Sequence, residues 1–249
     1  MPNNSLHRMR HNRRPGELCV GQLGEESEVG DQGDRNSPEP GGRALVPSLV
    51  HAIAEKGGTD LLVENGEVVL DQALEKGLEG VAEDIPILGS LVKLIKVGIG
   101  VREYLFLRKL AKFLLALNSI PDADRESFRE RVDADPRFRD SVGEKLLLLL
   151  ERADDLDKPA LIGKAFGAFL QRRIDYDQFV RMAAGLDRAL MADLRRLAQV
   201  SGPRIEEPWG ADLVPAGITV MSVHQLVGGN LTDYPLTETG ALVRDICLR

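Results

Sequence analysis

The chain has 249 residues, of which 43% are hydrophobic and only 4% aromatic, and its formal net charge is -7. This length and composition are sufficient for a buried core made mainly of aliphatic side chains. The negative charge argues against a protein that coats nucleic acid through its overall field. The two cysteines, Cys19 and Cys247, support neither a disulfide framework nor a zinc site built from cysteines. A reducing compartment is therefore expected.

Residues 1–43 are predicted to be a disordered tail. They are rich in Gly, Pro, Arg and acidic residues and show no apolar periodicity. Their Arg-rich start is similar to the first part of a signal peptide, but no apolar region follows it, so secretion by that route is not supported. The expected location is cytoplasmic, with a peripheral position at the inner membrane face as the alternative.

Residues 44–200 are predicted to form a helical domain. The stretch ALVPSLVHAIAEKGG, from Ala44, predicts an apolar helix that ends at Gly57–Gly58. Asn65-Gly66 then predicts a turn before a helix, because the apolar residues that follow recur at helical spacing. The same Asn-Gly pair is also compatible with a hairpin, but the polar residues on the opposite face favour the helix.

The most apolar stretch, DIPILGSLVKLIKVGIGVREYLFLRKLAKFLLAL at residues 84–117, predicts two helices or one kinked helix, because Gly98 and Gly100 weaken its middle. Charges interrupt it, so no uncharged window approaches the ~18 residues of a membrane-spanning helix. From Ile85 onward it has one acidic residue, Glu103, against six basic ones. These six are candidate contacts to an anionic surface: Lys93, Lys96, Arg102, Arg108, Lys109 and Lys112.

This basic segment has two interpretations. A basic amphipathic helix can lie on an anionic lipid surface, with its lysine stems along the apolar boundary. It can equally be a helix of a bundle whose charges are compensated within the chain, for example by the stretch DADRESFRERVDAD at residues 122–135. We favour the second interpretation.

A leucine-rich helix is predicted after residue 135. Asp135 is its expected N-cap, with Pro136 at the first helical position, and the five leucines 146–150 lie farther along. A run this dense covers more than one face of a helix. It therefore predicts either a central helix packed on several sides or a surface that a partner covers.

Two more helices are predicted before residue 200. Asp157 is the expected cap of the first, and Asp175 caps the second through a capping box with Gln178. Asp154 and Asp155 complete an acidic cluster with Asp157, which helix capping explains without a metal ion.

Beyond Val200, prolines, glycines and β-branched residues break the helical pattern. Residues 201–212 are predicted to be a linker, and residues 213–249 a small α+β unit. Within this unit ITVMSV and HQLV predict strands, GGN predicts a tight turn, and Thr237 is the expected N-cap of a final helix.

The phrase YPLTETGALVRDI resembles the wing strand and final helix of winged-helix domains, in which Y-x-L-T-x-x-G often closes the wing. The resemblance covers only the C-terminal unit and implies a DNA-binding role for it. The chain departs from that pattern because no helix with a basic face is evident before the hairpin.

The sequence predicts no catalytic residue, no cofactor and no metal ligand, so an enzyme is not expected. The histidines are scattered and match neither a catalytic triad nor a metal site: His7, His11, His51 and His224. A phosphate-binding loop of the Walker type is also absent from the sequence.

The phrases DIPILGSLVKL and LTETG, with the charged helical region between them, make the chain similar to uncharacterised bacterial proteins that are mostly helical. That resemblance implies no activity and no site. The expected fold is mainly α, a multi-helix bundle with a small C-terminal α+β, winged-helix-like unit and a disordered N-terminal tail.

The expected function is that of a non-enzymatic helical interaction or regulatory protein. It acts through a protein partner or self-association, with the basic segment and the leucine-rich helix packing against each other or against a partner chain. One alternative is a membrane-active protein that uses residues 85–117 on an anionic membrane. The other is a DNA-binding regulator that uses the C-terminal unit, although nucleic acid is the less expected partner.

Overall fold

The computed structural model describes residues 40–54, 101–226 and 229–249. Within these ranges the protein is mainly helical, with a small three-stranded antiparallel sheet near the C-terminus, which confirms the expected fold class. The predicted tail before residue 40, the turn at Asn65-Gly66 and the break at Gly98 and Gly100 lie outside the described residues.

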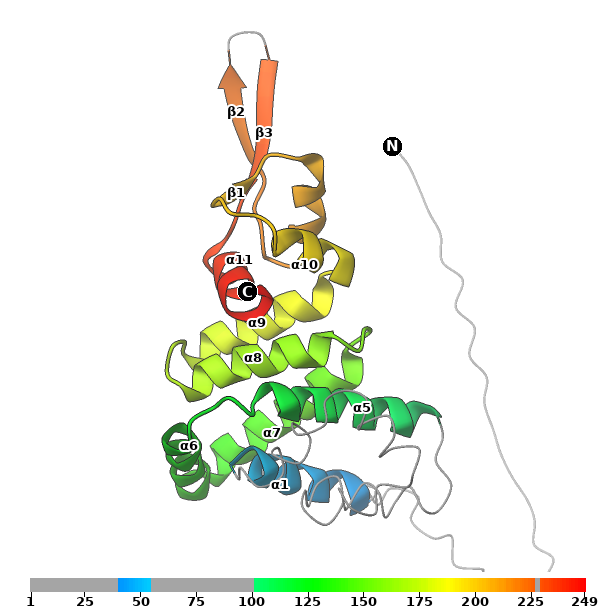
Figure 1. The fold of residues 1–249 in the computed structure, drawn as a ribbon, viewed down its shortest axis with the longest axis vertical. Helices are drawn as coiled ribbons and strands as arrows, with labels where there is room; N and C mark the ends of the chain where they lie inside the picture. Colours follow the sequence, from blue (N-terminus) through cyan, green and yellow to red (C-terminus); the bar gives the residue numbers. More distant parts are fainter. Residues whose placement is uncertain (1–39, 55–100, 227–228) are drawn as a thin grey trace, which may run out of the picture. The chain divides into compact units, whose positions relative to one another are not determined.

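The helical part is a set of packed helices in which α8 contacts both α5 and α9, while α1 contacts α6 and α7. Figure 1 shows α8 between α5 and α9. The helices are α1 (Pro40–Ala54), α5 (Val101–Ala116), α6 (Asp122–Ala134), α7 (Pro136–Arg152), α8 (Lys158–Leu170), α9 (Tyr176–Arg188) and α10 (Met191–Leu197).

The C-terminal part adds a sheet whose strand order is β1-β3-β2, with both neighbouring pairs antiparallel. The predicted N-cap is confirmed, because Thr237 Oγ1 accepts a hydrogen bond from the Gly240 N–H at 2.9 Å. The elements are β1 (Arg204–Ile205), the 3₁₀-helix η1 (Pro208–Leu213), β2 (Ser222–Leu226), β3 (Gly229–Pro235), α11 (Glu238–Leu242) and the π-helix η2 (Val243–Leu248).

The segment 201–212, predicted as a linker, is instead part of the fold, since it contains β1 and most of η1. Ile205 is 1% exposed, because β1 pairs with β3 and turns this side chain into the core. At the end of the chain, η2 contacts α8, α9 and α10, and its Val243 and Cys247 belong to the same buried cluster as the helices. The described helices and the described C-terminal strands belong to one compact unit, and residues 201–212 lie inside it.

Local sequence explains where two of the helices begin. Asp135 Oδ1 accepts hydrogen bonds from two backbone N–H groups in the first turn of α7, both at 3.1 Å. At the start of α9, Asp175 accepts from the Gln178 N–H at 2.8 Å, and the Gln178 side chain accepts from the Asp175 N–H at 3.0 Å. Both predicted caps are confirmed.

Two other helix starts differ from the prediction. Asp157 lies at the N-cap position of α8, but its side chain makes no capping hydrogen bond. Its carboxylate instead accepts from Lys112 at 3.1 Å and from Arg195 at 2.9 Å, because these cations hold it away from the helix end. In addition, α1 begins at Pro40 and not at Ala44, since proline suits a first helical turn, where its missing N–H is not needed.

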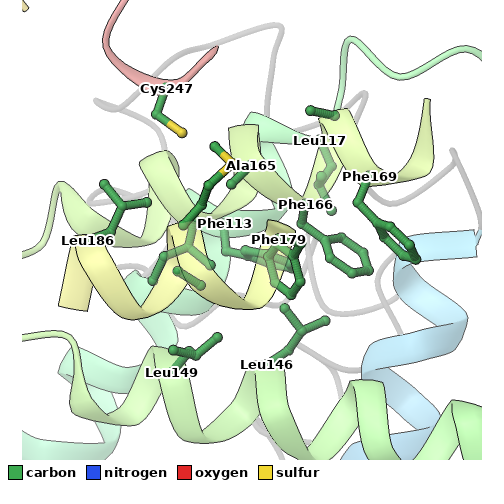
Figure 2. Packing of buried hydrophobic residues seen from close by; sticks show 14 of the residues in the cluster. Phe113, Leu117, Leu146, Leu149, Ala165, Phe166, Phe169, Phe179, Leu186 and Cys247 are labelled. Atoms are coloured by element: carbon green, nitrogen blue, oxygen red, sulfur yellow. The ribbon is translucent and has the colours of Figure 1, made fainter. Parts of the chain in front are cut away.

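The core is built around Phe166, which is fully buried. Its ring centroid lies 5.1 Å from that of Phe179, 5.6 Å from Phe169, 5.8 Å from Phe128 and 6.0 Å from Phe113. Figure 2 shows four of these rings together, with leucines of α7 beside them. Aromatic rings at these distances stabilise a core beyond the burial of their area. A chain that is only 4% aromatic thus places most of its seven phenylalanines at one point.

Most of the leucine run of α7 packs against the core. Leu146 and Leu150 are fully buried and Leu149 is 6% exposed, whereas Leu148 is 56% exposed. Leu147 is partly buried and packs against the same cluster. The run therefore belongs mainly to the core, with one leucine left at the surface.

A buried arginine of α6 joins the C-terminal ends of α1 and α5. Arg125 is 2% exposed, and its guanidinium donates to the carbonyl of Ile53 at 2.7 Å and to the carbonyl of Leu117 at 2.6 Å. Carbonyls at a helix C-terminus lack intrahelical donors and carry partial negative charge, so they are good partners for a cation. One turn along α6, Arg129 donates to the carbonyl of Ala54 at 3.2 Å. Arginines of α6 thus cap the C-terminal ends of α1 and α5.

α5 and α8 approach each other closely at Gly163. A Cβ at this position would lie 2.7 Å from the backbone carbonyl oxygen of Phe113 and 2.7 Å from the Cβ of Ala116. Real Cβ atoms do not make contacts this short, so the absence of a side chain at this position permits the observed spacing of the two helices.

We expect Arg125→Met to lower the free energy of unfolding by about 3 kcal/mol, because it leaves the buried carbonyls of Ile53 and Leu117 without their charged donor. Arg125→Lys should recover only part of this loss, since an ammonium lacks the planar fork that reaches both carbonyls. Urea denaturation measures both effects. The matched control is Arg129→Met, which removes a longer hydrogen bond at a less buried site and should cost about 1 kcal/mol. Equal losses at positions 125 and 129 would contradict the role assigned to Arg125.

Gly163→Ala should destabilise the protein by about 1–3 kcal/mol, even though alanine favours an isolated helix by about 1 kcal/mol. The added methyl group meets the backbone of α5, which cannot yield without separating the two helices. Gly167→Ala in the same helix is the control, because there the nearest atom, at 2.7 Å, is the flexible end of the Ile120 side chain. Thermal unfolding should show a larger loss of stability for Gly163→Ala than for Gly167→Ala. A stabilised Gly163→Ala variant would refute the close approach.

Candidate functional site

The structure places four of the six basic residues singled out in the sequence on α5: Arg102, Arg108, Lys109 and Lys112. The other two, Lys93 and Lys96, lie outside the described residues. The apolar side of α5 is buried in the core through Leu107, Leu110, Ala111, Phe113 and Leu114. The helix thus presents one side to the core and carries its basic residues elsewhere.

Residues 151–157, which we call the acidic junction, connect α7 to α8 and contact the basic residues of α5. Lys112 Nζ lies 3.1 Å from Asp157 Oδ1. Lys109 Nζ donates to the backbone carbonyl of Glu151 at 2.9 Å. Because the Lys112 side chain is only 14% exposed, its ion pair holds α5 to the start of α8 and is not a loose surface contact.

Arg102 is exposed, whereas the side chain of Arg108 is partly buried. Arg102 pairs with the carboxylate of Glu151, and the guanidinium of Arg108 lies 6.0 Å from the ring centroid of Tyr104. The sequence suggested residues 122–135 as the source of compensating charge. The described hydrogen-bonding partners of the basic residues of α5 lie in the acidic junction.

This geometry bears on the alternative of a lipid-bound α5. For the basic side to meet anionic headgroups, the contacts with the acidic junction would have to break while the opposite side remains in the core. Among the helices that the structure describes, none combines the length and the apolar character needed to cross a membrane.

Asp157 connects three elements, since it stands at the start of α8 and binds Lys112 of α5 and Arg195 of α10. The hydrogen bond from Lys112 lowers the pKa of Asp157 below its usual value, and the Coulombic attraction of the two cations acts in the same direction. Partial burial of the carboxyl opposes this effect. The carboxylate therefore stays ionised in the folded protein at neutral pH.

A second pair in the acidic junction is formed by Asp154 and Lys158, whose charged atoms lie 2.6 Å apart. The hydrogen bond from Lys158 lowers the pKa of Asp154. Lys158 is 1% exposed and also donates to the backbone carbonyl of Asp187 at 2.9 Å, so it connects the acidic junction to the end of α9. These charges have structural partners within the chain.

The second candidate surface is the hairpin arm, which we define as β2, β3 and the two residues before β2. Figure 1 shows β2 and β3 extending away from the helices. Four of its large apolar side chains are half exposed: Val220 (51%), Met221 (60%), Val223 (51%) and Leu231 (50%). Because side chains alternate along a strand, Met221 and Val223 lie on one face of the ribbon and Val220 and Leu231 on the other. The sequence predicted the strands but not this exposure, since an apolar strand pattern does not tell which faces are covered.

A polar group fixes the base of the hairpin arm. His224 Nε2 lies 3.1 Å from Ser222 Oγ and 3.2 Å from Asp233 Oδ1, and Asp233 Oδ2 accepts from Arg204 at 2.9 Å. A catalytic triad needs the serine and the carboxylate on different imidazole nitrogens. Here both approach the same nitrogen, so Ser222, His224 and Asp233 do not have the geometry of a catalytic triad. The 2% exposed Asp233 instead ties β3 to β1 through Arg204.

An open hollow of about 740 Å³ lies between α6 and the turn that joins α8 to α9. Arg172 in its wall has a φ of 57°, which is uncommon for a residue other than glycine, and it donates to Ser127 Oγ at 2.6 Å. The charged residues of the wall are of both signs: Glu130, Arg131, Arg172 and Asp175. This balance selects neither an anion nor a cation.

The segment before the hairpin arm bears on the DNA-binding alternative. A winged-helix domain reads DNA with a helix that precedes its wing. In this chain the helix at that place is η1, whose sequence PWGADL contains no lysine or arginine. It therefore offers no basic side chain to a phosphate backbone.

Comparison with known proteins adds no relative, since no protein-family model, curated protein or solved structure matches the chain. Among the residues that the structure describes, no group of three His, Cys, Asp or Glu side chains is placed to hold a metal ion. The inference of function rests on the surfaces described above.

We expect Asp157→Asn to lower the free energy of unfolding at pH 7 by about 1 kcal/mol, because it removes the negative partner of Lys112 and Arg195. Since the folded state lowers the pKa of Asp157, its stabilising effect is complete above the unfolded pKa of about 3.9 and is lost as the pH falls through the folded value. Urea denaturation at pH 7, and at pH values below about 4, should therefore show a difference between wild type and variant that shrinks in acid.

The matched control for this experiment is Asp177→Asn. Its carboxylate pairs with Arg181 across one turn of α9, where both side chains are exposed, so little change is expected. A stability difference at position 157 that does not depend on pH would rule out an ionic origin.

Proposed function

We propose that this chain is a non-enzymatic interaction protein that acts through contacts with other protein chains, and that the hairpin arm supplies the contact surface. The observation that carries the proposal is the half-exposed set of Val220, Met221, Val223 and Leu231 on one short ribbon. Single exposed apolar residues are common, but a group of them on a projecting element is typical of a surface that another molecule covers.

The charge distribution supports the same choice. The basic residues of α5, which locally reverse the negative charge of the sequence, already contact the acidic junction through Lys112 and Lys109. The described helices thus act mainly as a support for the hairpin arm. The hairpin arm, in contrast, presents apolar side chains on both faces.

The base of the arm is also held in place by contacts with the rest of the fold. A two-stranded ribbon alone is only marginally stable. Here the contact between Asp233 and Arg204 holds its base, and Tyr234 is 8% exposed beneath η1. A partner would therefore meet a preformed surface, which reduces the ordering entropy lost on binding.

Site-specific photo-crosslinking in cells that naturally express the chain tests the proposal. A crosslinking residue at position 231 should give adducts of discrete mass, and Val223→Lys should reduce them several-fold, because a lysine stem in the middle of the ribbon disfavours an apolar contact. Val101→Lys is the matched control, since Val101 is 76% exposed at the start of α5, away from the arm in the chain.

The proposal predicts loss of adducts in Val223→Lys and their retention in Val101→Lys. Absence of any adduct at position 231, or adducts that both substitutions leave unchanged, would overturn it.

A further inference from the structure

We infer that β2 of one chain pairs with β2 of a second copy, antiparallel and across a two-fold axis, so that the two hairpin arms form one continuous sheet. This inference rests on the proposed function and names its partner. Three properties of the edge carry it: its position in the sheet, its lack of charge and its complementarity to its own copy.

β2 is an edge strand, because the order β1-β3-β2 leaves one of its sides without a strand among the described residues. Its pairing with β3 is regular, from Ser222 opposite Asp233 to Leu226 opposite Gly229, without a bulge. Proteins normally protect an exposed edge with a lysine, a proline, a bulge or an inward-pointing charge. β2 has the sequence SVHQL, which contains none of these, and its histidine already contacts Asp233.

The charge of the edge favours a second copy as the partner. Near a two-fold axis each side chain meets its own copy, so any charged residue there would face a like charge. Between Gly217 and Tyr234 the only charged side chain, apart from the histidine, is Asp233, which is buried and paired with Arg204. The chain as a whole has a net charge of -7, so its copies repel each other over most of their surface. The arm adds almost no like charge of its own to this repulsion.

The backbone of an antiparallel edge is complementary to itself. Its N–H and C=O groups alternate, and a copy rotated by half a turn presents acceptors to donors and donors to acceptors. An axis perpendicular to the sheet also keeps Met221 and Val223 of both copies on one face, where they gain apolar neighbours across the new strand pair. The opposite edge, beside β3, is less suited because half-exposed Arg204 flanks it.

The extent of the pairing sets its strength. β2 has five residues, so the contact is smaller than the roughly 800 Å² per partner that stable complexes bury. We therefore expect a dimer that forms in a concentration-dependent way. Sedimentation equilibrium of the full chain over about a hundred-fold range of concentration, reaching well above the micromolar range, should show monomer and dimer.

Val223→Lys should weaken the dimer by about ten-fold or more, because it places two like charges near the axis. Val101→Lys, with the same added charge on α5, should leave the dimer constant unchanged. Met221→Lys provides a second variant on the same face of the arm. Thermal unfolding of each variant shows that the fold is retained.

A mixture of Val223→Lys and Val223→Glu chains distinguishes pairing between copies from a general effect of charge. Each variant alone should remain monomeric, and the mixture should associate about ten-fold more strongly than either, because opposite charges then meet near the axis. A monomeric wild type at every concentration would overturn the inference, and so would variants that associate as the wild type does. Crosslinks from position 231 to other proteins, together with a monomeric purified chain, would retain the proposed function and remove this partner.

Discussion

Arg125 is the group on which the arrangement of the helices depends, because it is the point at which α1, α5 and α6 meet. A cation that is 2% exposed is costly unless it is hydrogen-bonded, and the C-terminal carbonyls of two helices are costly when they lack donors. The guanidinium of Arg125 supplies the donors that the carbonyls lack, and the carbonyls supply the acceptors that the buried cation needs. The carbonyl of Ile53 lies 72 positions away in the chain, while that of Leu117 lies eight positions away. A single side chain therefore links two helix ends in one tertiary contact. The phenylalanine core around Phe166 packs among the helices that this contact holds together.

Charged side chains of different helices also satisfy one another nearer the surface. The acidic junction lies where α7, α8, α5 and α10 come together, and Asp157 accepts from a lysine of α5 and an arginine of α10. Three of the basic residues that form the local reversal of charge in the sequence, Arg102, Lys109 and Lys112, contact the acidic junction in the fold. Lys109 and Lys112 of α5 are thus engaged in contacts within the fold. Among the described residues, the hairpin arm gathers four half-exposed apolar side chains on one ribbon, although Leu148 and Leu190 are also exposed elsewhere.

The sequence predicted what depends on neighbours along the chain. The caps at Asp135 and Asp175 follow from spacings of two and three residues and are confirmed. Asp157 was wrong as a capping side chain because its partners lie 45 and 38 positions away, where no local pattern extends. Residues 201–212, predicted as a linker, contain β1, which becomes a strand only through its pairing with β3, much later in the chain. His224 and Ser222 share a face by strand alternation, but their contact with Asp233 depends on the register of the hairpin.

The exposure of the hairpin arm could not be predicted from the sequence and becomes evident only in the fold. Neutral, β-branched residues predict a strand equally well whether it is buried or exposed. In the fold, the base of the arm is held tightly: Thr219 Oγ1 donates to the carbonyl of Gly210 at 2.7 Å, and a Cβ at Gly210 would lie 2.7 Å from the ring of Tyr234. Such close packing at the base keeps β2 and β3 ordered although both faces of the ribbon are half exposed. A strand edge that is ordered, neutral and unprotected has little entropy left to lose, so even a short backbone pairing can be favourable there.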